Sequence, residues 1–177
     1  MKLSKIERYS LSNQLRILEA LYPNEASEFA VQREVFENGY ELLYESGMQH
    51  VYDDDDVLTE KECLEVWDTM EMFEGIDRSF KNLGIDHDEH GFTKFRGYDG
   101  NSEGKFMSFA EFTVKKERRF AYLPLNEADY FNSHMQVRET YNRMLEVWRE
   151  VDPKDRYSMN KQTLDTLLNA SIHPENR

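Results

Sequence analysis

Apolar side chains recur at every third or fourth position across residues 59–83, which is the spacing of one face of an α-helix. The positions of this stripe are Val66, Met70, Phe73, Ile76, Phe80 and Leu83. Thr59 and Glu62 have the spacing of a capping box, and Gly84 suits the left-handed residue that ends a helix. A second apolar face near its start indicates that other elements cover this helix from more than one side. The pattern therefore predicts a central helix near 59–83.

Two features of this predicted helix need an explanation beyond periodicity. A glycine inside a helix costs up to about 1 kcal/mol relative to alanine, so Gly75 indicates that another helix approaches closely there. Glu71 and Met72 lie outside the main apolar stripe. The face that carries them is therefore our first candidate for a site or a subunit contact.

The same periodicity predicts shorter helices on both sides of this element. Their expected ranges are 4–22, 25–38, 102–120, 134–151 and a last helix from 158 or 160 to about 171, with a short further helix at 40–44. Ser4 with Glu7, and Ser133 with Gln136, have the spacing of capping boxes for the helices at 4 and 134.

Glycines at 84, 91, 97 and 100 exclude a long helix between the central element and the one that follows it. Residues 92–98 are the one short extended segment that we expect. The sequence therefore predicts an all-α fold of about six or seven helices. We expect these helices to form a single domain over residues 1–177.

The first predicted helix, 4–22, is apolar on two opposite sides. One side carries Ile6, Tyr9, Ile17, Ala20 and Leu21, and the other carries Leu11, Leu15, Leu18 and Tyr22. A helix of this kind is either interior or shared between the core and another subunit. Ser10 and Asn13 fall in the middle of the first side, where they need hydrogen-bond partners if they are buried.

Composition limits the partners and the compartment. The chain has 177 residues, 13% of them aromatic, and a net charge of −13, which opposes binding to nucleic-acid backbones and to anionic membranes. Its single cysteine, Cys63, allows no internal disulfide. The first residues lack the apolar core of a secretory signal, and no apolar run has the length of a membrane span. We therefore expect a cytoplasmic protein with no nucleic-acid or membrane partner.

Two segments have ligand types that metal ions use. Residues 99–106 resemble the first eight positions of a calcium-binding EF-hand loop. The bidentate glutamate of that loop is displaced by one position to Glu111, which rotates it by about 100° around a helix. Residues 86–90 contain three carboxylates and two histidines, but consecutive residues of a loop rarely converge on one ion. The favoured interpretations are helix capping for residues 99–106 and a solvated loop for residues 86–90, so we expect no metal and no cofactor.

The remaining chemical signals are weak. Residues 115–119 form a basic cluster, whose side chains would spread around a helix as a solvated face. Neither a nucleophile elbow nor a glycine-rich phosphate loop is present in the sequence. Cys63 lies beside apolar residues, which favours a packing role over a reactive thiol.

Several short sequences, taken in their order and spacing, resemble the YfbU family of bacterial proteins. They are Leu11-Ser12-Asn13-Gln14, Met70-Glu71-Met72, Asn82-Leu83, Phe95-x-Gly97-Tyr98-Asp99, Phe131-Asn132, Tyr141-x-Arg143-Met144-Leu145-x-Val147-Trp148 and Asn169-Ala170. The resemblance extends from about residue 6 to 170, and it implies a multihelical, cytoplasmic, oligomeric protein. It implies no catalytic mechanism, and it weakens both metal interpretations because the family lacks those two patterns.

Two hypotheses of function follow. The first is a non-enzymatic, cytoplasmic, self-associating interaction or regulatory protein that forms a homo-oligomer. The second is an enzyme, for example a hydrolase, whose site is assembled from dispersed polar residues; calcium or transition-metal binding is a minor alternative. The candidate polar residues are Ser10, Asn13, Gln14, Glu71, Glu74 and Arg143. For each of them, a buried polar network or a surface salt bridge is the favoured interpretation.

Overall fold

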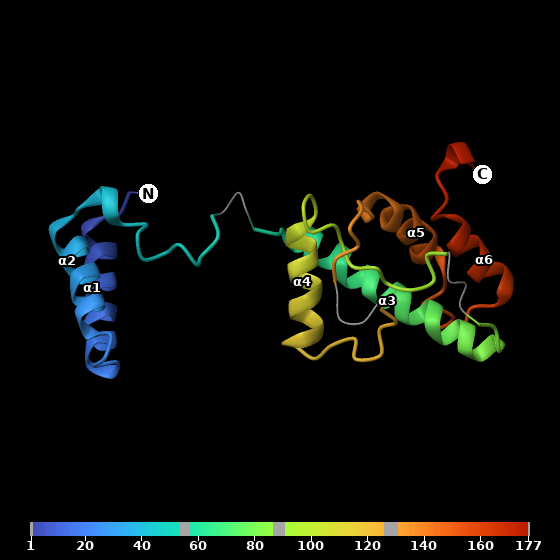
Figure 1. Cartoon of the computed structure of the whole chain (residues 1–177), viewed down its shortest axis with the longest axis horizontal. Helices are drawn as coiled ribbons and strands as arrows, with labels where there is room; N and C mark the ends of the chain where they lie inside the picture. Colours follow the sequence, from blue (N-terminus) through green and yellow to red (C-terminus); the bar gives the residue numbers. More distant parts are fainter. Residues whose placement is uncertain (1, 54–56, 87–90, 126–130, 177) are drawn as a thin grey trace. The chain divides into compact units, whose positions relative to one another are not determined.

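The computed structural model describes residues 2–53, 57–86, 91–125 and 131–176 (Figure 1). The chain forms two compact units, Met1–Val57 and Leu58–Arg177. Across the described residues, helices are the only regular secondary structure apart from two isolated bridges. The prediction of an all-α, multihelical fold is therefore confirmed. That the two units make up a single domain stays a prediction.

The first unit is a pair of antiparallel helices, α1 (Lys5–Leu21) and α2 (Ala26–Asn38), followed by the short 3-10 helix η1 (Glu41–Leu43). The Ser4 side chain accepts from the Glu7 amide and the Glu7 side chain accepts from the Ser4 amide, so the predicted capping box is present. Gly39 ends α2 in the left-handed region, with φ of 74°. The buried apolar residues between these elements are Leu15, Val35, Phe36 and Tyr44.

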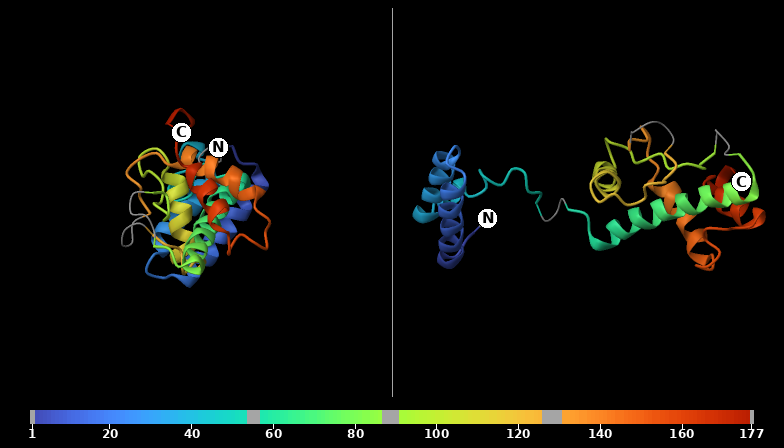
Figure 2. Two further views of the ribbon diagram at one scale, coloured as in Figure 1. Left: turned by 90° about the vertical axis from the view of Figure 1, so that its right-hand side faces the viewer. Right: turned by 90° about the horizontal axis from the view of Figure 1, so that it is seen from below.

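The second unit is built around α3 (Glu60–Leu83), its longest helix, which the right-hand view of Figure 2 shows along its length. Both predicted caps are present, because Thr59 and Glu62 form a capping box and Gly84 is left-handed. Helix α3 packs against α4 (Gly104–Lys115), α5 (Arg138–Glu150) and α6 (Lys161–Asn169). Its role as a central helix is thus confirmed within this unit, which ends with η3 (Pro174–Asn176).

Helix α4 is shorter than the predicted range 102–120. It begins after Glu103 and ends at Lys115, and the chain then turns through the left-handed residues Arg118 and Phe120, with φ of 56° and 51°. A right-handed helix cannot continue through such residues. The aromatic and apolar residues that suggested a longer helix lie partly in this turn.

Helix α5 begins four residues later than predicted. The expected capping box of Ser133 and Gln136 is wrong: the Ser133 hydroxyl donates to the backbone carbonyl of Met135, and His134 is left-handed with φ of 54°. The first residue of the helix is Arg138, and Val137 precedes it without a cap from its own side chain. For α6, the cap is Asn160, whose side chain accepts from the Thr163 amide.

The expected extended segment at 92–98 pairs with the chain between α4 and α5. Phe95 and Leu125 form one isolated parallel bridge, and Tyr98 and Asn132 form another. Gly97 lies between them with φ of 78°, and a Cβ atom there would come within 1.9 Å of the Phe131 carbonyl oxygen. Only glycine fits this close backbone approach.

The core of the second unit is rich in aromatic residues. Its largest fully buried side chains are Trp148, Tyr98, Tyr141, Phe73, Phe95, Met70, Met72 and Ile76. The predicted close approach at Gly75 is also present, since a Cβ atom there would lie 2.5 Å from the Trp148 ring and 2.6 Å from the Arg156 carbonyl oxygen. The glycine in α3 therefore makes room for the indole of α5.

Candidate functional site

The two predicted apolar sides of α1 have different surroundings. Leu15 is buried against α2, with Leu11 and Leu18 packed beside it. The opposite side, which we name the outer face of α1, consists of Ile6, Tyr9, Asn13, Ile17, Ala20 and Leu21. Ile6, Tyr9, Ile17 and Leu21 are 80%, 68%, 58% and 65% exposed. Scattered exposed apolar residues are common, but a stripe of them along one side of a helix, here interrupted by Asn13, is typical of interaction sites.

Two of the candidate polar residues lie on or beside the outer face. Ser10 is exposed and Asn13 is half-buried. Neither side chain makes a hydrogen bond with any described residue. Asn13 therefore has amide donors and an amide acceptor that are available to a partner at the centre of an apolar stripe.

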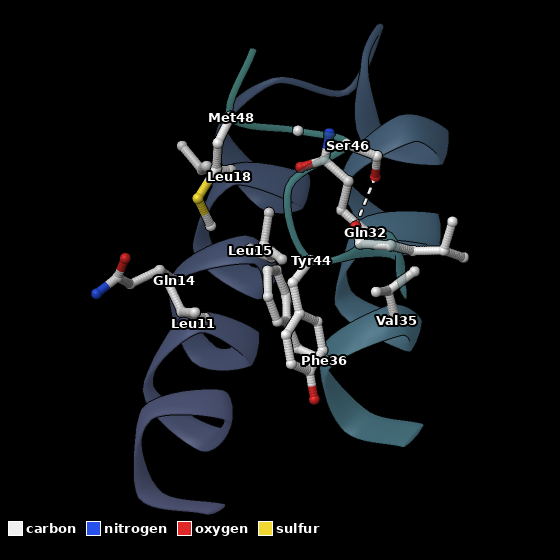
Figure 3. A pocket seen from close by; sticks show the side chains of 12 residues that line it. Leu11, Gln14, Leu15, Leu18, Gln32, Val35, Phe36, Tyr44, Ser46 and Met48 are labelled. Atoms are coloured by element: carbon white, nitrogen blue, oxygen red, sulfur yellow. Dashed lines mark hydrogen bonds between the residues drawn. The ribbon is translucent and has the colours of Figure 1, made fainter. Parts of the chain in front are cut away.

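Gln14 lies at the rim of a small apolar cavity within the first unit, and its amide points away from the cavity (Figure 3). The cavity has a volume of about 130 Å³ and lies between α1, α2 and the segment 43–48. The stacked rings of Phe36 and Tyr44, with centroids 5.4 Å apart, form part of its wall. A space of this size accommodates an apolar side chain rather than a substrate.

Glu71 is held by a residue far along the chain. The Tyr157 hydroxyl donates to the Glu71 carboxylate at 2.8 Å, and the Arg78 guanidinium lies 4.9 Å from the centre of the Tyr157 ring. Burial, together with the hydrogen bond to the negative Glu71, raises the pKa of Tyr157 to about 12. The off-stripe face of α3 is therefore occupied by a polar contact inside the second unit. Met72, beside Glu71, is fully buried.

Glu74 lies one helical turn beyond Glu71 on α3 and is half-buried. Burial raises the pKa of the Glu74 carboxyl, while the nearby positive charge of Arg78 and a hydrogen bond from the Tyr122 backbone oppose that rise. Glu71 and Glu74 are thus neighbours on one face, as their spacing requires.

Arg143 ties α5 to the end of α6. Its guanidinium donates to the backbone carbonyl of Ala170 at 3.3 Å, to that of Ser171 at 3.0 Å and to the Thr140 hydroxyl at 3.1 Å. A positive charge at the C-terminal end of a helix is favourable, and carbonyls there lack helical partners. The contacts of Arg143 are those of a structural residue that joins two helices.

The buried carboxylate of Glu103 was not among the candidate polar residues, although Glu103 lies in the segment 99–106 that resembles a calcium loop. It accepts hydrogen bonds from the backbone amides of Asp99 at 3.0 Å, Val137 at 3.2 Å and Arg138 at 2.9 Å. Arg138 in turn forms a bidentate ion pair with Glu65, at 2.7 Å and 3.0 Å. Sequence reasoning missed this network because the contacts of Val137 with Glu103 and of Arg138 with Glu103 and Glu65 span 34 to 73 residues. Its one local signal was an acidic residue directly before a helix.

Neither metal motif corresponds to a cluster of ligands in the described ranges, where no three His, Cys, Asp or Glu side chains form a group that could hold an ion. The Asp99 carboxylate accepts from the backbone amide and the hydroxyl of Ser102, which closes the turn before α4. In the segment 86–90, residues 87–90 lie outside the described residues.

The basic cluster lies at the exposed end of α4. Lys115 pairs with Glu111 at 2.7 Å, and the Arg119 guanidinium lies 5.7 Å from the centre of the Trp67 ring.

Cys63 is half-buried, and burial raises the pKa of its thiol, which disfavours the reactive thiolate. In the part of the chain that the structure describes, no helix is both long and apolar enough to cross a membrane.

A family profile described as the YfbU domain matches residues 1–170. The chain is also similar to the UPF0304 protein MJECS11 of Methanocaldococcus jannaschii, with 32% identity over 173 residues that cover 95% of this chain and 99% of that protein. Neither description names a reaction or a ligand. Both comparisons extend across the two units, from α1 to α6, and they confirm the resemblance seen in the sequence. The chain belongs to the YfbU domain family.

Proposed function

We propose that the protein is a cytoplasmic, self-associating interaction or regulatory protein rather than an enzyme. The outer face of α1 carries this proposal, because it exposes four large apolar side chains on one helix. Exposed apolar surface of this kind is costly in water and is favourable when a partner covers it. Among the candidate polar residues, Glu71 and Arg143 are engaged in contacts within the second unit.

Two different exposed apolar residues provide a direct test. Replacing Ile17 by lysine places a charge within the outer face, whereas replacing Val31 by lysine changes a residue of α2 that is also exposed, at 65%. We expect native mass spectrometry and light scattering to give an oligomer for the wild type and for Val31→Lys at micromolar concentration. Ile17→Lys should shift the mass toward the monomer, with unchanged helicity by circular dichroism.

A monomeric wild-type mass at micromolar concentration would defeat the proposal of self-association. Native mass spectra of protein taken from its source organism also address the alternative of an enzyme. A co-purifying small ligand at one molecule per chain would favour that alternative, whereas a stoichiometric protein partner would favour an interaction role.

A further inference from the structure

The outer face of α1 is nearly symmetric about its centre. Asn13 lies four residues from both Tyr9 and Ile17, and seven residues from both Ile6 and Ala20. Each of these four positions is apolar, and all of them are on the same side of the helix as Asn13 because spacings of four and seven residues preserve the face. At these five positions the order of residues is therefore the same in both directions, with apolar residues on either side of a polar residue, whereas Leu21 corresponds to Lys5 at the other end.

We infer that two copies of this chain pack α1 against α1 in antiparallel orientation, with a two-fold axis that passes beside Asn13. The inference rests on the proposed function and specifies the partner of the same surface. In this arrangement Tyr9 meets the partner's Ile17, and Ile6 meets the partner's Ala20. Such a contact is isologous, since one surface patch serves both subunits.

Asn13 favours a second copy over a partner of different sequence. A carboxamide has both donors and an acceptor, so an asparagine on a two-fold axis can pair with its own copy. An apolar partner would leave the amide buried without hydrogen bonds, which is unfavourable. Single asparagines at the centre of apolar helical stripes fix register and orientation in other paired helices in the same way.

The distribution of charge favours the antiparallel orientation. Lys2 and Lys5 lie at the N-terminal end of α1, where the helix dipole is also positive. A parallel pair would bring these lysines together with those of the partner and align the two dipoles. The antiparallel pair places Lys5 opposite the partner's Leu21 and opposes the dipoles. The small Ala20 opposite Ile6 permits the helices to approach closely at both ends.

Disulfide trapping in a Cys63→Ala background tests this geometry with the full-length chain. An Asn13→Cys variant should form a covalent dimer on mild oxidation, because residues on the axis meet their own copies. Disulfides require Cα atoms within about 7 Å of each other. In the antiparallel pair the two copies of residue 6 are offset by 14 residues, or about 21 Å along the helix. Ile6→Cys alone should therefore stay monomeric on a denaturing gel, and a mixture with Ala20→Cys should cross-link.

A second measurement does not depend on cysteine chemistry. Asn13→Asp places two carboxylates against each other on the axis, and we expect it to weaken self-association by at least about tenfold. Gln14→Glu adds the same charge at an exposed neighbouring position and should change the affinity by less than Asn13→Asp. Equal effects of the two substitutions would overturn the proposed axis.

The outcomes separate this inference from the proposed function. A wild-type monomer would overturn both. A wild-type oligomer whose Asn13→Cys variant fails to cross-link would overturn the antiparallel pairing alone. An oligomer in which Ile6→Cys cross-links to itself would also overturn the antiparallel pairing, because that result indicates parallel packing. Cross-linking of Val31→Cys on α2 as fast as that of Asn13→Cys would overturn it too, because that result indicates random collision.

Discussion

The Glu103 carboxylate accepts a 2.9 Å hydrogen bond from the backbone amide of Arg138, across 35 residues of chain. The same carboxylate accepts from Val137, the residue directly before α5. The start of α5 is therefore stabilised by a side chain that lies directly before α4. Because a negative charge at a helix N-terminus is favourable and the first amides of a helix have no helical partners, Glu103 fulfils both needs at once.

Replacing Glu103 by glutamine should destabilise the protein by about 2 kcal/mol, since the variant removes a buried charge that accepts several backbone hydrogen bonds. Glu111→Gln on α4, which breaks only the exposed pair with Lys115, serves as the matched control and should change the free energy of unfolding by less than about 0.5 kcal/mol. Urea denaturation followed by tryptophan fluorescence measures the free energy of unfolding of each variant. Equal stability of the two variants would contradict the capping role of Glu103.

Replacing Gly75 by alanine should destabilise the protein although alanine is the better helix former. The gain in helix propensity is about 1 kcal/mol, but the new Cβ atom would collide with the Trp148 ring and the Arg156 carbonyl oxygen. Overpacking in a core costs about 1–3 kcal/mol. We therefore expect the midpoint temperature of thermal unfolding to be lower for the variant than for the wild type. Gly104→Ala at the start of α4 has open space around its Cβ position. It should leave the midpoint unchanged or raise it slightly.

Replacing Tyr157 by phenylalanine should lower the free energy of unfolding by about 1 kcal/mol near neutral pH, because the hydrogen bond to Glu71 is lost. The pKa of Tyr157 is raised from 10.0 to about 12 in the folded protein. The stability that this tyrosine contributes is therefore complete below pH 10 and is lost as the pH rises from 10 to 12. Denaturation curves across that window should converge for the wild type and the variant. A constant difference would contradict the raised pKa.

Replacing Thr59 by alanine should cost about 1 kcal/mol, the usual effect of removing an N-cap hydroxyl. The Thr59 hydroxyl accepts from the Glu62 amide at 3.3 Å and donates to the Glu62 carboxylate at 2.8 Å. Thr166→Ala removes a hydroxyl from the exposed part of α6 without touching a cap and should be nearly neutral. A calorimetric melt that ranks these two variants in the opposite order would argue against the capping box.

The features that the sequence predicted correctly are those whose causes lie within a few residues. The capping box of Thr59 and Glu62 and the left-handed Gly84 depend on local geometry, and both are present. Gly75 is an intermediate case: its local cost indicated a close contact, but only the fold shows that Trp148 provides it.

The features that the sequence failed to predict have distant partners. The prediction of a capping box formed by Ser133 and Gln136 was wrong, because the Glu103 carboxylate, which lies in another loop, caps the start of α5 by accepting from the Arg138 amide. The role of Glu71 was invisible because its partner, Tyr157, is 86 residues away. The two apolar sides of α1 were visible in the sequence, and the structure adds which of them faces α2.

The close approach of Gly97 to Phe131 has a consequence for how relatives of this protein can vary. The bridges Phe95–Leu125 and Tyr98–Asn132 join the connection after α3 to the connection before α5 at two points, which are three residues apart in the first segment and seven residues apart in the second. An insertion between 95 and 98, or one beside Phe131, would shift one segment past the other and bring a bulkier residue to the position of Gly97. Insertions and deletions should therefore be rare at residues 95–98 and beside Phe131, and should accumulate elsewhere in the two connections, although neither paired segment is a regular strand.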